Sequence, residues 1–481
     1  MHFKFPSSAK ENLPITKESN TPRRDFLKML SFALGTTLLR PITAVAQVGP
    51  TQFFSRKKAD KPKRILVIGA GLAGLTAAYE LTQAGHEVTV FEARNRAGGR
   101  VLTVRDFADG LYAEAGGEGI EHNHDYMLRY LEEFGLSLYP GSYDNPAPLD
   151  ALPRERTPQD ALKDVVKQIE PFAQFSHPDY DKISFAELLK QLEASSEMME
   201  QMQRYVSALM AINIESISAL AMLNEMALPA TRATFRIAGG NDQVPKRLAS
   251  QLRERIHYTR PVVKITHNAE GVEITIMENG LRQTVTGQFL IIAAPLTCVR
   301  RIEISPALSE PQMRAIATLA YGQVLKVPMQ FRERFWLKQN SDLNKGLPGL
   351  ISSVYESSKG QAGTRGLLTA YIPDKSGFEI ASLSTDQRLG KVLAKITEVH
   401  PEAQRQFEGG YVKWWQEDVW AQGTYAYFRP GDVMSLRPVL TKAEGRIHFA
   451  GEHTAGWQGY MNGAIESGHR AAQEVYDSKL R

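Results

Sequence analysis

The glycine pattern Gly69-Ala70-Gly71-Leu72-Ala73-Gly74 constrains the fold of this chain more than any other segment. It directly follows an apolar run, Arg64 to Ile68, which is typical of a buried parallel strand, and it opens a segment with helical composition, Leu72 to Ala84. In such a unit the first glycine permits the tight turn, the second lets backbone amides approach a diphosphate, and the third lets helix and strand pack closely. The pattern therefore predicts the start of a βαβ unit that binds a dinucleotide.

The next expected strand, Glu87 to Glu92, ends in a carboxylate. A carboxylate at this place in a βαβ unit accepts hydrogen bonds from the two hydroxyls of a ribose, and we see no arginine positioned for a 2′-phosphate. FAD and NAD are therefore both compatible with these residues.

Beyond this unit the apolar residues change their spacing along the chain. Residues Ser184 to Leu228 repeat at spacings of three and four and predict a helical insertion. Residues Ile256 to Pro295 alternate, with a turn at Asn279-Gly280, and predict a β-meander; Gln323 to Phe331 predicts a further strand. A chain of 481 residues exceeds what one core usually holds, so we expect an α/β protein with two intertwined domains.

The N-terminal segment has the layout of an export signal. Paired arginines, Arg23 and Arg24, precede an apolar run from Met29 to Leu39 and a small-residue end at Ala44-Val45-Ala46. This layout predicts a cleavable signal peptide over residues 1–46 that is read by the twin-arginine translocation machinery, with delivery to the periplasm or beyond. The alternatives are a basic arm or a membrane anchor, although the apolar run is short for a membrane span.

Charge and cysteine content exclude several classes of function. The net charge of +4 equals that of residues 1–46, which hold seven Lys/Arg and three Asp/Glu, so the rest of the chain is balanced and offers no basic patch for nucleic acid. Cys298 is the single cysteine, so no intramolecular disulfide can form. We expect no metal site, because His122 and His124 have no third ligand at a recognisable spacing.

Two further segments resemble a known family. The first runs from Ala93 to Thr103 and contains Gly98-Gly99-Arg100, and the second contains Gly451-Glu452 followed by Tyr460-Met461. From about Arg64 to Ala472 the chain resembles the flavin-containing amine oxidases, which include monoamine, polyamine and L-amino acid oxidases. The resemblance implies FAD as the cofactor and an α/β fold in which a Rossmann-like FAD-binding domain is interleaved with a mixed-sheet substrate domain and a helical insertion.

On this basis we divide the chain into seven segments. They are the signal peptide 1–46, a linker 47–63, the FAD-binding domain in three parts (64–145, 231–300 and 436–481), a mainly helical insertion 146–230, and a substrate domain 301–435.

The resemblance also implies which residues contact FAD. These are Gly69, Gly71, Gly74, Glu92, Arg94, Gly99, Arg100, Gly116, Gly117, Glu118, Val262, Gly451, Glu452 and Met461. Some relatives tether the flavin through a cysteine in the stretch that matches Trp420 to Phe428. Gly423 and Thr424 stand there in this chain and Cys298 lies elsewhere, so we expect FAD to be bound non-covalently.

Four residues are expected at the site of chemistry: Lys326, Tyr460, Thr424 and Trp457. Lys326 lies on an otherwise apolar strand, where an exposed lysine is the ordinary interpretation. The resemblance instead implies that Lys326 holds a water against flavin N5, and that Tyr460 forms one wall of an aromatic cage. Thr424 matches the opposite wall, so the cage is expected to be incomplete unless Trp457 or a neighbouring tyrosine compensates.

The expected substrate follows from Gly119. L-amino acid oxidases commonly carry an arginine at the matching position to bind the substrate carboxylate, and a glycine has no such group. We therefore expect a primary amine to be oxidised by O2 to an aldehyde, with ammonia and hydrogen peroxide. The alternatives are an L-amino acid oxidase that gives a 2-oxo acid, a dehydrogenase with another acceptor, and a non-catalytic flavin-binding protein; Glu118, His122 and His124 could also face a cationic substrate tail.

Overall fold

The structure is a computed structural model that describes residues 54, 57–141, 178–226, 234–339, 343 and 351–479. The predicted signal peptide, residues 1–46, lies outside the described residues, as does part of the predicted linker 47–63. The chain divides into two compact units, of which the smaller holds the described residues 178–226 and 428–435 and the larger holds the others.

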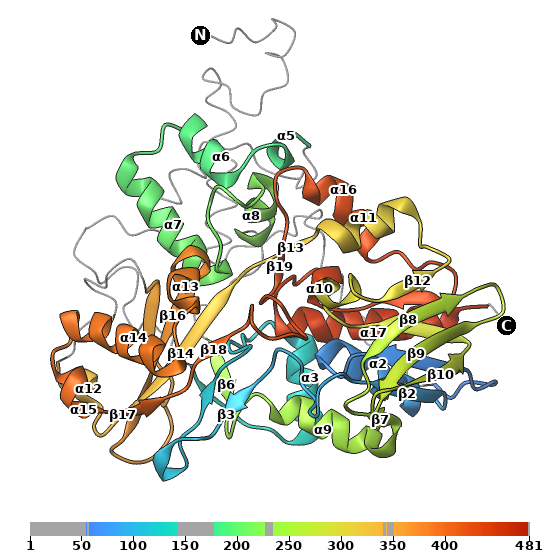
Figure 1. Ribbon diagram of the computed structural model, residues 1–481, viewed down its shortest axis with the longest axis horizontal. Coiled ribbons are helices and arrows are strands. Elements are labelled where there is room, and N and C mark those ends of the chain that lie inside the picture. Colours follow the sequence, from blue (N-terminus) through green and yellow to red (C-terminus); the bar gives the residue numbers. More distant parts are fainter. Residues whose placement is uncertain are drawn as a thin grey trace, which may run out of the picture. The chain divides into compact units, whose positions relative to one another are not determined.

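A five-stranded parallel sheet runs through part of the larger unit (Figure 1). Its strand order is β20-β11-β1-β2-β7, with every neighbouring pair parallel. The strands are β1 (Arg64–Ile68), β2 (Glu87–Phe91), β7 (Ile256–His257), β11 (Phe289–Ile292) and β20 (Ile447–Phe449). Both strands predicted around the glycine pattern are therefore confirmed, and so is the helix between them, α2 (Leu72–Gln83).

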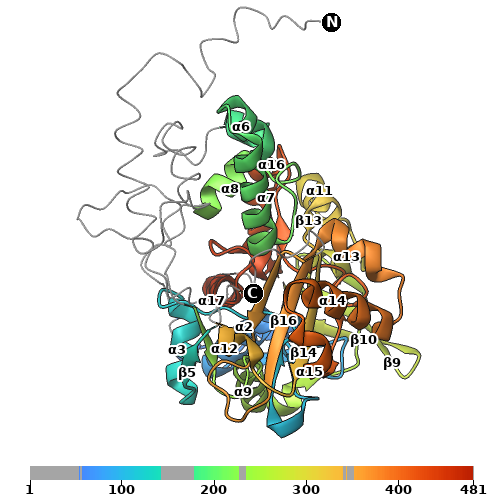
Figure 2. The same ribbon diagram turned by 90° about the vertical axis from the view of Figure 1, so that its left-hand side faces the viewer.

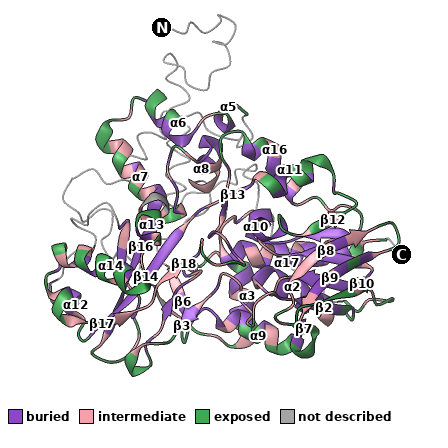
Figure 3. Cartoon of the chain, in the orientation of Figure 1, coloured by how far each residue is buried: buried purple, intermediate pink, exposed green. Residues whose placement is uncertain are grey.

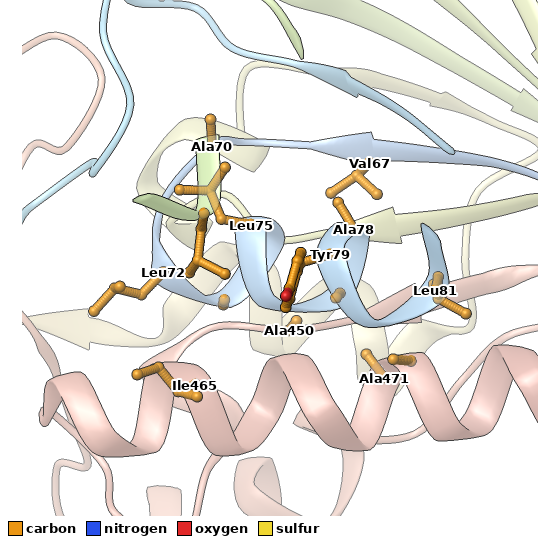
Figure 4. Close-up of a cluster of buried hydrophobic side chains, with 14 of the residues drawn as sticks. Val67, Ala70, Leu72, Leu75, Ala78, Tyr79, Leu81, Ala450, Ile465 and Ala471 are labelled. Carbon is orange, nitrogen blue, oxygen red and sulfur yellow. The ribbon is translucent and has the colours of Figure 1, made fainter. Parts of the chain in front are cut away.

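Two helices that are far apart in the sequence pack against each other beside this sheet. Figure 4 shows side chains of α2, among them Leu72 and Leu81, facing Ile465 and Ala471 of α17 (Met461–Asp477). The close approach depends on glycine, because a Cβ at Gly468 would lie 2.5 Å from the carbonyl oxygen of Ala73. The apolar core of the parallel sheet is thus completed by the C-terminal end of the chain.

A second sheet contains the predicted meander. It consists of β8 (Val262–His267), β9 (Val272–Glu278) and β10 (Leu281–Gly287) in antiparallel pairing, with β12 (Glu303–Ser305) parallel to β8. The expectation that one meander spans Ile256 to Pro295 is wrong at both ends, because β7 pairs with β2 and β11 lies between β1 and β20, so that both strands belong to the parallel sheet. All four residues of β11 are buried, as expected for a strand that is covered on both faces.

The third sheet is antiparallel and carries Lys326. Strand β14 (Val324–Phe331) lies between β16 (Gly366–Pro373) on one side and β17 (Phe407–Gly410) with β18 (Lys413–Trp414) on the other, while β15 (Ser353–Glu356) pairs with β16. Alternate residues of β14, beginning at Leu325, pack into a core beneath helices that lie along the sheet in Figures 1 and 2. The helices are α12 (Phe335–Gln339), α13 (Asp374–Ala381), α14 (Thr385–Val399) and α15 (Glu402–Gln406).

Every residue of β14 is buried, and Figure 3 shows the strand in the colour of buried residues. Because side chains alternate along a strand, Lys326 points to the face opposite the apolar core. The interpretation of Lys326 as an exposed surface lysine is therefore wrong, since its exposed fraction is 5%.

The smaller unit is helical in its described residues. It contains α5 (Pro178–Asp181), α6 (Phe185–Gln191), α7 (Ser196–Met210) and α8 (Ala219–Met226). The other elements are β3 (Thr103–Val104), β4 (Ala113–Glu114), β5 (Leu138–Pro140), β6 (Phe235–Ile237), β13 (Ala320–Tyr321), β19 (Ala426–Tyr427), α3 (Asp125–Phe134), α9 (Gln243–Leu252), α10 (Leu296–Val299), α11 (Glu310–Thr318), α16 (Asp432–Leu440) and the 3₁₀ turns η2 (Ala108–Gly110), η3 (Arg253–Arg255) and η4 (Glu452–Thr454). In the described part of the chain, no helix combines the length and the apolar character that a membrane span requires.

Candidate active site

The glycine turn connects β1 to α2 with the geometry that its sequence predicts. Gly69 has a φ of +103°, which residues with a side chain rarely adopt. A Cβ at Gly74 would lie 2.0 Å from the carbonyl oxygen of Gly69, so helix and turn could not pack this closely with alanine. At Gly71, by contrast, an added Cβ meets no described atom within 4 Å, so there is open space beside the start of α2.

Glu92 closes this turn from the end of β2. One carboxylate oxygen accepts the Ala70 amide at 2.7 Å, and the other accepts the Arg94 amide at 2.8 Å. The carbonyl of Glu92 accepts the amide of Arg260, which brings the segment before β8 to the same place. Val262, two residues later, begins β8 and is half-buried, so the structure brings its backbone near the glycine turn through Glu92.

The Gly98-Gly99 segment lies against the glycine turn, and Gly98 forms a parallel bridge with Gly71. The Gly98 amide donates to the Ala70 carbonyl at 2.8 Å, and a Cβ at Gly99 would lie 3.3 Å from the Cα of Gly71. Arg94, however, extends to Asp418, with 2.5 Å between the guanidinium and the carboxylate. In this structure the Arg94 side chain is thus engaged by a protein carboxylate.

Arg100 and Glu452 form a partly buried ion pair of 2.9 Å between two segments that the sequence predicts as cofactor contacts. Arg100 also donates to the carbonyl oxygen of Thr424. The second oxygen of Glu452 accepts the Gly459 amide at 3.0 Å. Burial is the largest single effect on the pKa of Arg100 and lowers it, but the charge and hydrogen bond of Glu452, together with the nearby Tyr321 and Cys298, outweigh burial and raise the pKa, so the guanidinium stays charged.

The Gly116-Gly117 turn lies against the start of α17. A Cβ at Gly116 would meet the Arg100 carbonyl oxygen at 2.0 Å, and a Cβ at Gly117 would meet the Met461 sulfur at 3.1 Å. Gly116 therefore requires glycine for space, whereas a side chain at Gly117 would require the Met461 side chain to shift. The predicted contacts Gly116, Gly117 and Met461 are adjacent in the structure.

Lys326 belongs to a buried cluster of charged groups. Its ammonium lies 2.6 Å from the Glu118 carboxylate and donates to the carbonyl oxygens of Gly116 at 2.9 Å and Glu114 at 3.3 Å. Its three N–H groups therefore all have protein acceptors. A water held by Lys326 would have to replace one of them, and the longest of these bonds is the one to Glu114.

Three side chains surround the Glu118 carboxylate: Lys326 and Tyr355 donate hydrogen bonds to one oxygen, Oε2, and Arg236 forms an ion pair with the other, Oε1, which accepts no hydrogen bond from the described residues. Besides Lys326, the Tyr355 hydroxyl donates to the carboxylate at 2.6 Å and the Arg236 guanidinium lies at 2.8 Å. Burial would raise the pKa of Glu118, but Arg236 and Lys326 outweigh this effect and lower it. Because Glu118 is 8% exposed and its oxygens are engaged, we discard the interpretation that it faces a cationic substrate tail, and no direct cofactor contact follows from these bonds.

Glu114 is a second buried acid beside this cluster. Burial is the largest effect on its pKa, and with the nearby Glu118 charge it raises the pKa to about 8 against the hydrogen bonds from the Asn241 amide and Thr103. Glu114 is thus protonated near neutral pH.

The aromatic residues near the start of α17 form a cluster. The Trp457 and Tyr460 rings meet edge to face at 5.5 Å, and His124 packs on them at 5.0 and 5.5 Å. Burial lowers the pKa of His124 to about 4, so its imidazole is neutral at physiological pH. His124 is therefore part of an aromatic wall, which differs from the expected loop histidine facing a cationic group.

The side chains of Thr424 and Tyr425 differ in their position relative to the aromatic cluster. The Thr424 side chain is buried, whereas the Tyr425 ring lies against Gly459, next to Tyr460. The Tyr425 hydroxyl lies 3.0 Å from that of Tyr371, which is the direct neighbour of Lys326 on β16. The cage was expected to be incomplete at Thr424 unless Trp457 or a neighbouring tyrosine compensates, and the structure places the ring of such a tyrosine, Tyr425, against Gly459.

Sequence reasoning missed Arg236, Tyr355 and Asp418 as members of the site. They are single charged or aromatic residues without a motif. Arg236 lies on β6, Tyr355 lies on β15, and Asp418 follows β18, so segments far apart in sequence bring them to the site. Asn241, also missed, donates to the carbonyls of Gly117 and Glu118 at 3.1 and 2.7 Å and so holds that turn. Its place directly after Gly239-Gly240 was the one available signal.

The residues present fit a bound flavin dinucleotide. Neither α2 nor α17 has a side-chain cap at its N-terminus, so the amides of both first turns are available to an anionic ligand. The buried atoms Thr424 Oγ1 and His453 Nδ1 have no hydrogen-bond partner among the described residues. Together with the open space beside Gly71, these groups provide room and polar partners for such a ligand. Among the same residues, no group of three His, Cys, Asp or Glu side chains is arranged to hold a metal ion.

The parallel sheet, its glycine turn and the buried charged cluster define an oxidoreductase that binds FAD. The chain belongs to the family of flavin containing amine oxidoreductases, whose model matches residues 72–476. It is 29% identical to a putative L-amino-acid oxidase, YobN, of Bacillus subtilis over 86% of this chain and 95% of that protein, and 30% identical to an L-amino-acid oxidase of Mus musculus over 87% and 71%. In structure it is similar to cyclohexylamine oxidase from Brevibacterium oxydans, with a TM-score of 0.76 and 22% identity over 88% of this chain and 100% of that one.

Proposed function

We propose that this amine oxidoreductase oxidises a primary amine that carries no carboxylate, with O2 as electron acceptor. The products are an aldehyde, ammonia and hydrogen peroxide. FAD, when bound, supplies the acceptor for the hydride equivalent, and the protein supplies orientation, water exclusion and charge.

The contacts of the cations around the site, and not its net charge, carry this proposal. Each of four cations around it already faces a carboxylate: Lys326 and Arg236 share Glu118, Arg100 pairs with Glu452, and Arg94 pairs with Asp418. An amino-acid substrate brings a carboxylate that needs a cation of its own. Position 119 could supply such a cation, but it holds a glycine. Among the described residues, Thr234 alone lies within 4 Å of a Cβ added there.

The aromatic residues bind the amine in a site that excludes water. Tyr460, Trp457 and Tyr425 provide apolar ring surfaces that exclude water and favour the neutral amine over its ammonium form, which lacks the lone pair needed for oxidation. Lys326 keeps a positive charge close by, which favours electron transfer from the reduced cofactor to O2 because superoxide is an anion.

An L-amino acid oxidase is the second candidate, and similarity to the two L-amino-acid oxidases above favours it. The two functions differ in one group of the substrate, so the test uses matched pairs of an amino acid and the amine that lacks its carboxylate. We expect amines of such pairs to bleach the flavin absorbance of the anaerobic holoenzyme and to yield peroxide in air. Bleaching by the amino acids alone would reject the amine proposal, and bleaching by neither would reject both.

The variant Gly119→Arg provides a matched control. It places a guanidinium at a position where Thr234 is the one described residue within 4 Å of an added Cβ, and we expect it to shift the ratio of kcat/KM toward the amino acid of each pair by about tenfold or more, the effect of one charge-assisted contact. An unchanged ratio would show that position 119 does not face the substrate.

We also propose that FAD is held without a covalent bond. The single cysteine, Cys298, lies buried in α10, and Thr424 stands in the stretch where some relatives carry a tethering cysteine. Acid precipitation should therefore release all of the yellow cofactor into the supernatant; colour retained in the pellet would contradict this.

Export by the twin-arginine route is a further proposal, supported by the segment from Arg23 to Ala46. A protein that encloses a dinucleotide acquires it where the cofactor is made, so folding before transport suits this route. We expect Arg23→Lys combined with Arg24→Lys to retain the precursor inside the cell. Unchanged delivery of the double variant, measured by cell fractionation, would reject the route.

A further inference from the structure

The Glu118 carboxylate occupies the centre of the buried cluster that contains Lys326. It is the one carboxylate that the structure places in an ion pair with Lys326, and it is also within 2.8 Å of Arg236. Lys326 and Arg236 both lie over the Tyr355 ring, at 6.0 and 5.8 Å from its centre. All four side chains belong to different segments, so the cluster exists only in the folded protein.

The cluster is connected to the start of α17 by a short route. Lys326 donates to the carbonyl of Gly116, and the next residue, Gly117, lies against Met461, the first residue of α17. Asn241 fixes the same turn by donating to the carbonyls of Gly117 and Glu118. A shift of the Lys326 ammonium would therefore disturb the turn that borders the uncapped amides of α17.

The charges of the cluster do not cancel. Lys326 and Arg236 contribute two positive charges and Glu118 one negative charge, while the adjacent Glu114 is protonated near neutral pH. A simple Lys326–Glu118 pair would be neutral, so Arg236 makes the difference. In a buried site of low effective dielectric constant, one uncompensated charge acts over several ångströms.

We propose that Glu118 is a positioning residue for Lys326, and that Arg236 shares the Glu118 carboxylate so that the cluster keeps one positive charge beside the flavin. This inference rests on the proposed function, because it assigns the charge to the transfer of electrons from reduced flavin to O2. It predicts that Glu118 acts through Lys326 and that the charge of Arg236, more than its shape, is required.

The first experiment separates positioning from general stability. The holoenzyme is reduced chemically, without any amine, and its reoxidation by O2 is followed by stopped flow in wild type, Glu118→Gln, Lys326→Met and the double variant. We expect Glu118→Gln to slow reoxidation by about tenfold, to leave FAD bound, and to add little in the Lys326→Met background, since residues that act as one unit are non-additive. Reoxidation of Glu118→Gln at the wild-type rate, or an equal slowing in both backgrounds, would overturn the inference.

The second experiment addresses Arg236 and provides a variant in case Glu118→Gln does not fold. We expect Arg236→Met to lower the midpoint potential of the flavin and to slow reoxidation, because an anionic reduced flavin loses a nearby positive charge. Arg236→Lys keeps the charge and should retain both properties, and Tyr355→Phe should slow reoxidation less than Glu118→Gln. Equal potentials in wild type and Arg236→Met, or an Arg236→Lys variant as impaired as Arg236→Met, would contradict charge sharing.

These measurements are independent of the proposed substrate. If no amine reduces the wild-type flavin, the proposed function fails, while chemical reduction still tests the cluster. Conversely, if amines reduce the flavin but the Glu118 and Arg236 variants reoxidise at the wild-type rate, the proposed function holds and this inference is rejected.

Discussion

The Arg100 guanidinium lies 2.9 Å from the Glu452 carboxylate, although 352 residues separate the two in sequence. Arg100 extends from the segment after the first βαβ unit, and Glu452 from the turn that follows β20. Because Glu452 also accepts the Gly459 amide, the pair joins the segments that follow β2 and β20 of the parallel sheet to the loop before α17.

Loss of one member of this pair should weaken both the fold and cofactor binding. Removing one partner of a buried ion pair typically costs about 3–5 kcal/mol, because the other charge is left without compensation. We expect Glu452→Gln and Arg100→Gln to lower the melting temperature of the apoprotein and to raise the Kd for FAD at least about tenfold, the equivalent of 1.4 kcal/mol. Calorimetry and FAD titration measure the two effects, and a wild-type Kd in both variants would contradict a role near the cofactor.

Alanine at two positions of the glycine turn should have opposite effects on fold and cofactor. Gly74→Ala forces a Cβ to within 2.0 Å of the Gly69 carbonyl, so we expect the apoprotein to lose about 1–3 kcal/mol of stability, as overpacked sites do. Gly71→Ala places its Cβ in open space and should leave the apoprotein as stable as wild type. The Gly71→Ala holoenzyme should nevertheless bind FAD more weakly, because that space is expected to receive the diphosphate; wild-type affinity would show that it does not.

The stability of the protein should decrease as the pH rises because of Glu114. Its pKa is about 8 in the folded protein and near 4.5 when unfolded, so between these values the folded state holds a proton that the unfolded state has released. Stability from this group is complete below about pH 4.5 and is lost toward pH 8, with a slope of up to about 1.4 kcal/mol per pH unit. Denaturant unfolding from pH 5 to 8 should therefore show a steeper decline in wild type than in Glu114→Gln, and parallel profiles would refute the assignment.

The aromatic cluster should affect turnover more than folding. We expect Tyr460→Phe and Tyr425→Phe to retain most activity, because both keep the ring, whereas Tyr460→Ala should lower kcat/KM by about tenfold or more through loss of water exclusion and ring contact. Steady-state kinetics with a responsive amine, together with the melting temperature, provides the check. A loss in Tyr460→Phe as large as in Tyr460→Ala would mean that the hydroxyl is the important group.

Much of the FAD-binding part could be predicted from sequence because its requirements are local. The strand Arg64–Ile68, the glycine turn and the helix that follows depend on residues within one short segment, and the structure confirms these elements. The extent of the meander could not be predicted correctly, because β10 and β11 are adjacent in sequence and their separation into two sheets depends on partners elsewhere.

The site shows the same division. A motif marked Glu92, Arg100, Glu452 and Met461, and the structure brings their segments together. No local motif indicated Arg236 or Tyr355. Thr424 was predicted at one wall of the aromatic cage with a neighbouring tyrosine as its possible replacement, and the hydroxyl of that tyrosine, Tyr425, lies 3.0 Å from the Tyr371 hydroxyl.

The sequence by itself determined the type of fold and the cofactor class, because glycine positions and apolar runs act through short-range sterics that are the same in any chain. Only the tertiary structure decided how the charges are paired. Lys326 was recognisable from sequence as an unusual lysine on an apolar strand. Its ion-pair partner, Glu118, is 208 residues away in the chain, and Arg236 is connected to Lys326 only through a second ion pair with Glu118. Burial makes each of these charges dependent on a specific neighbour, and that neighbour is set by strand pairing between distant segments.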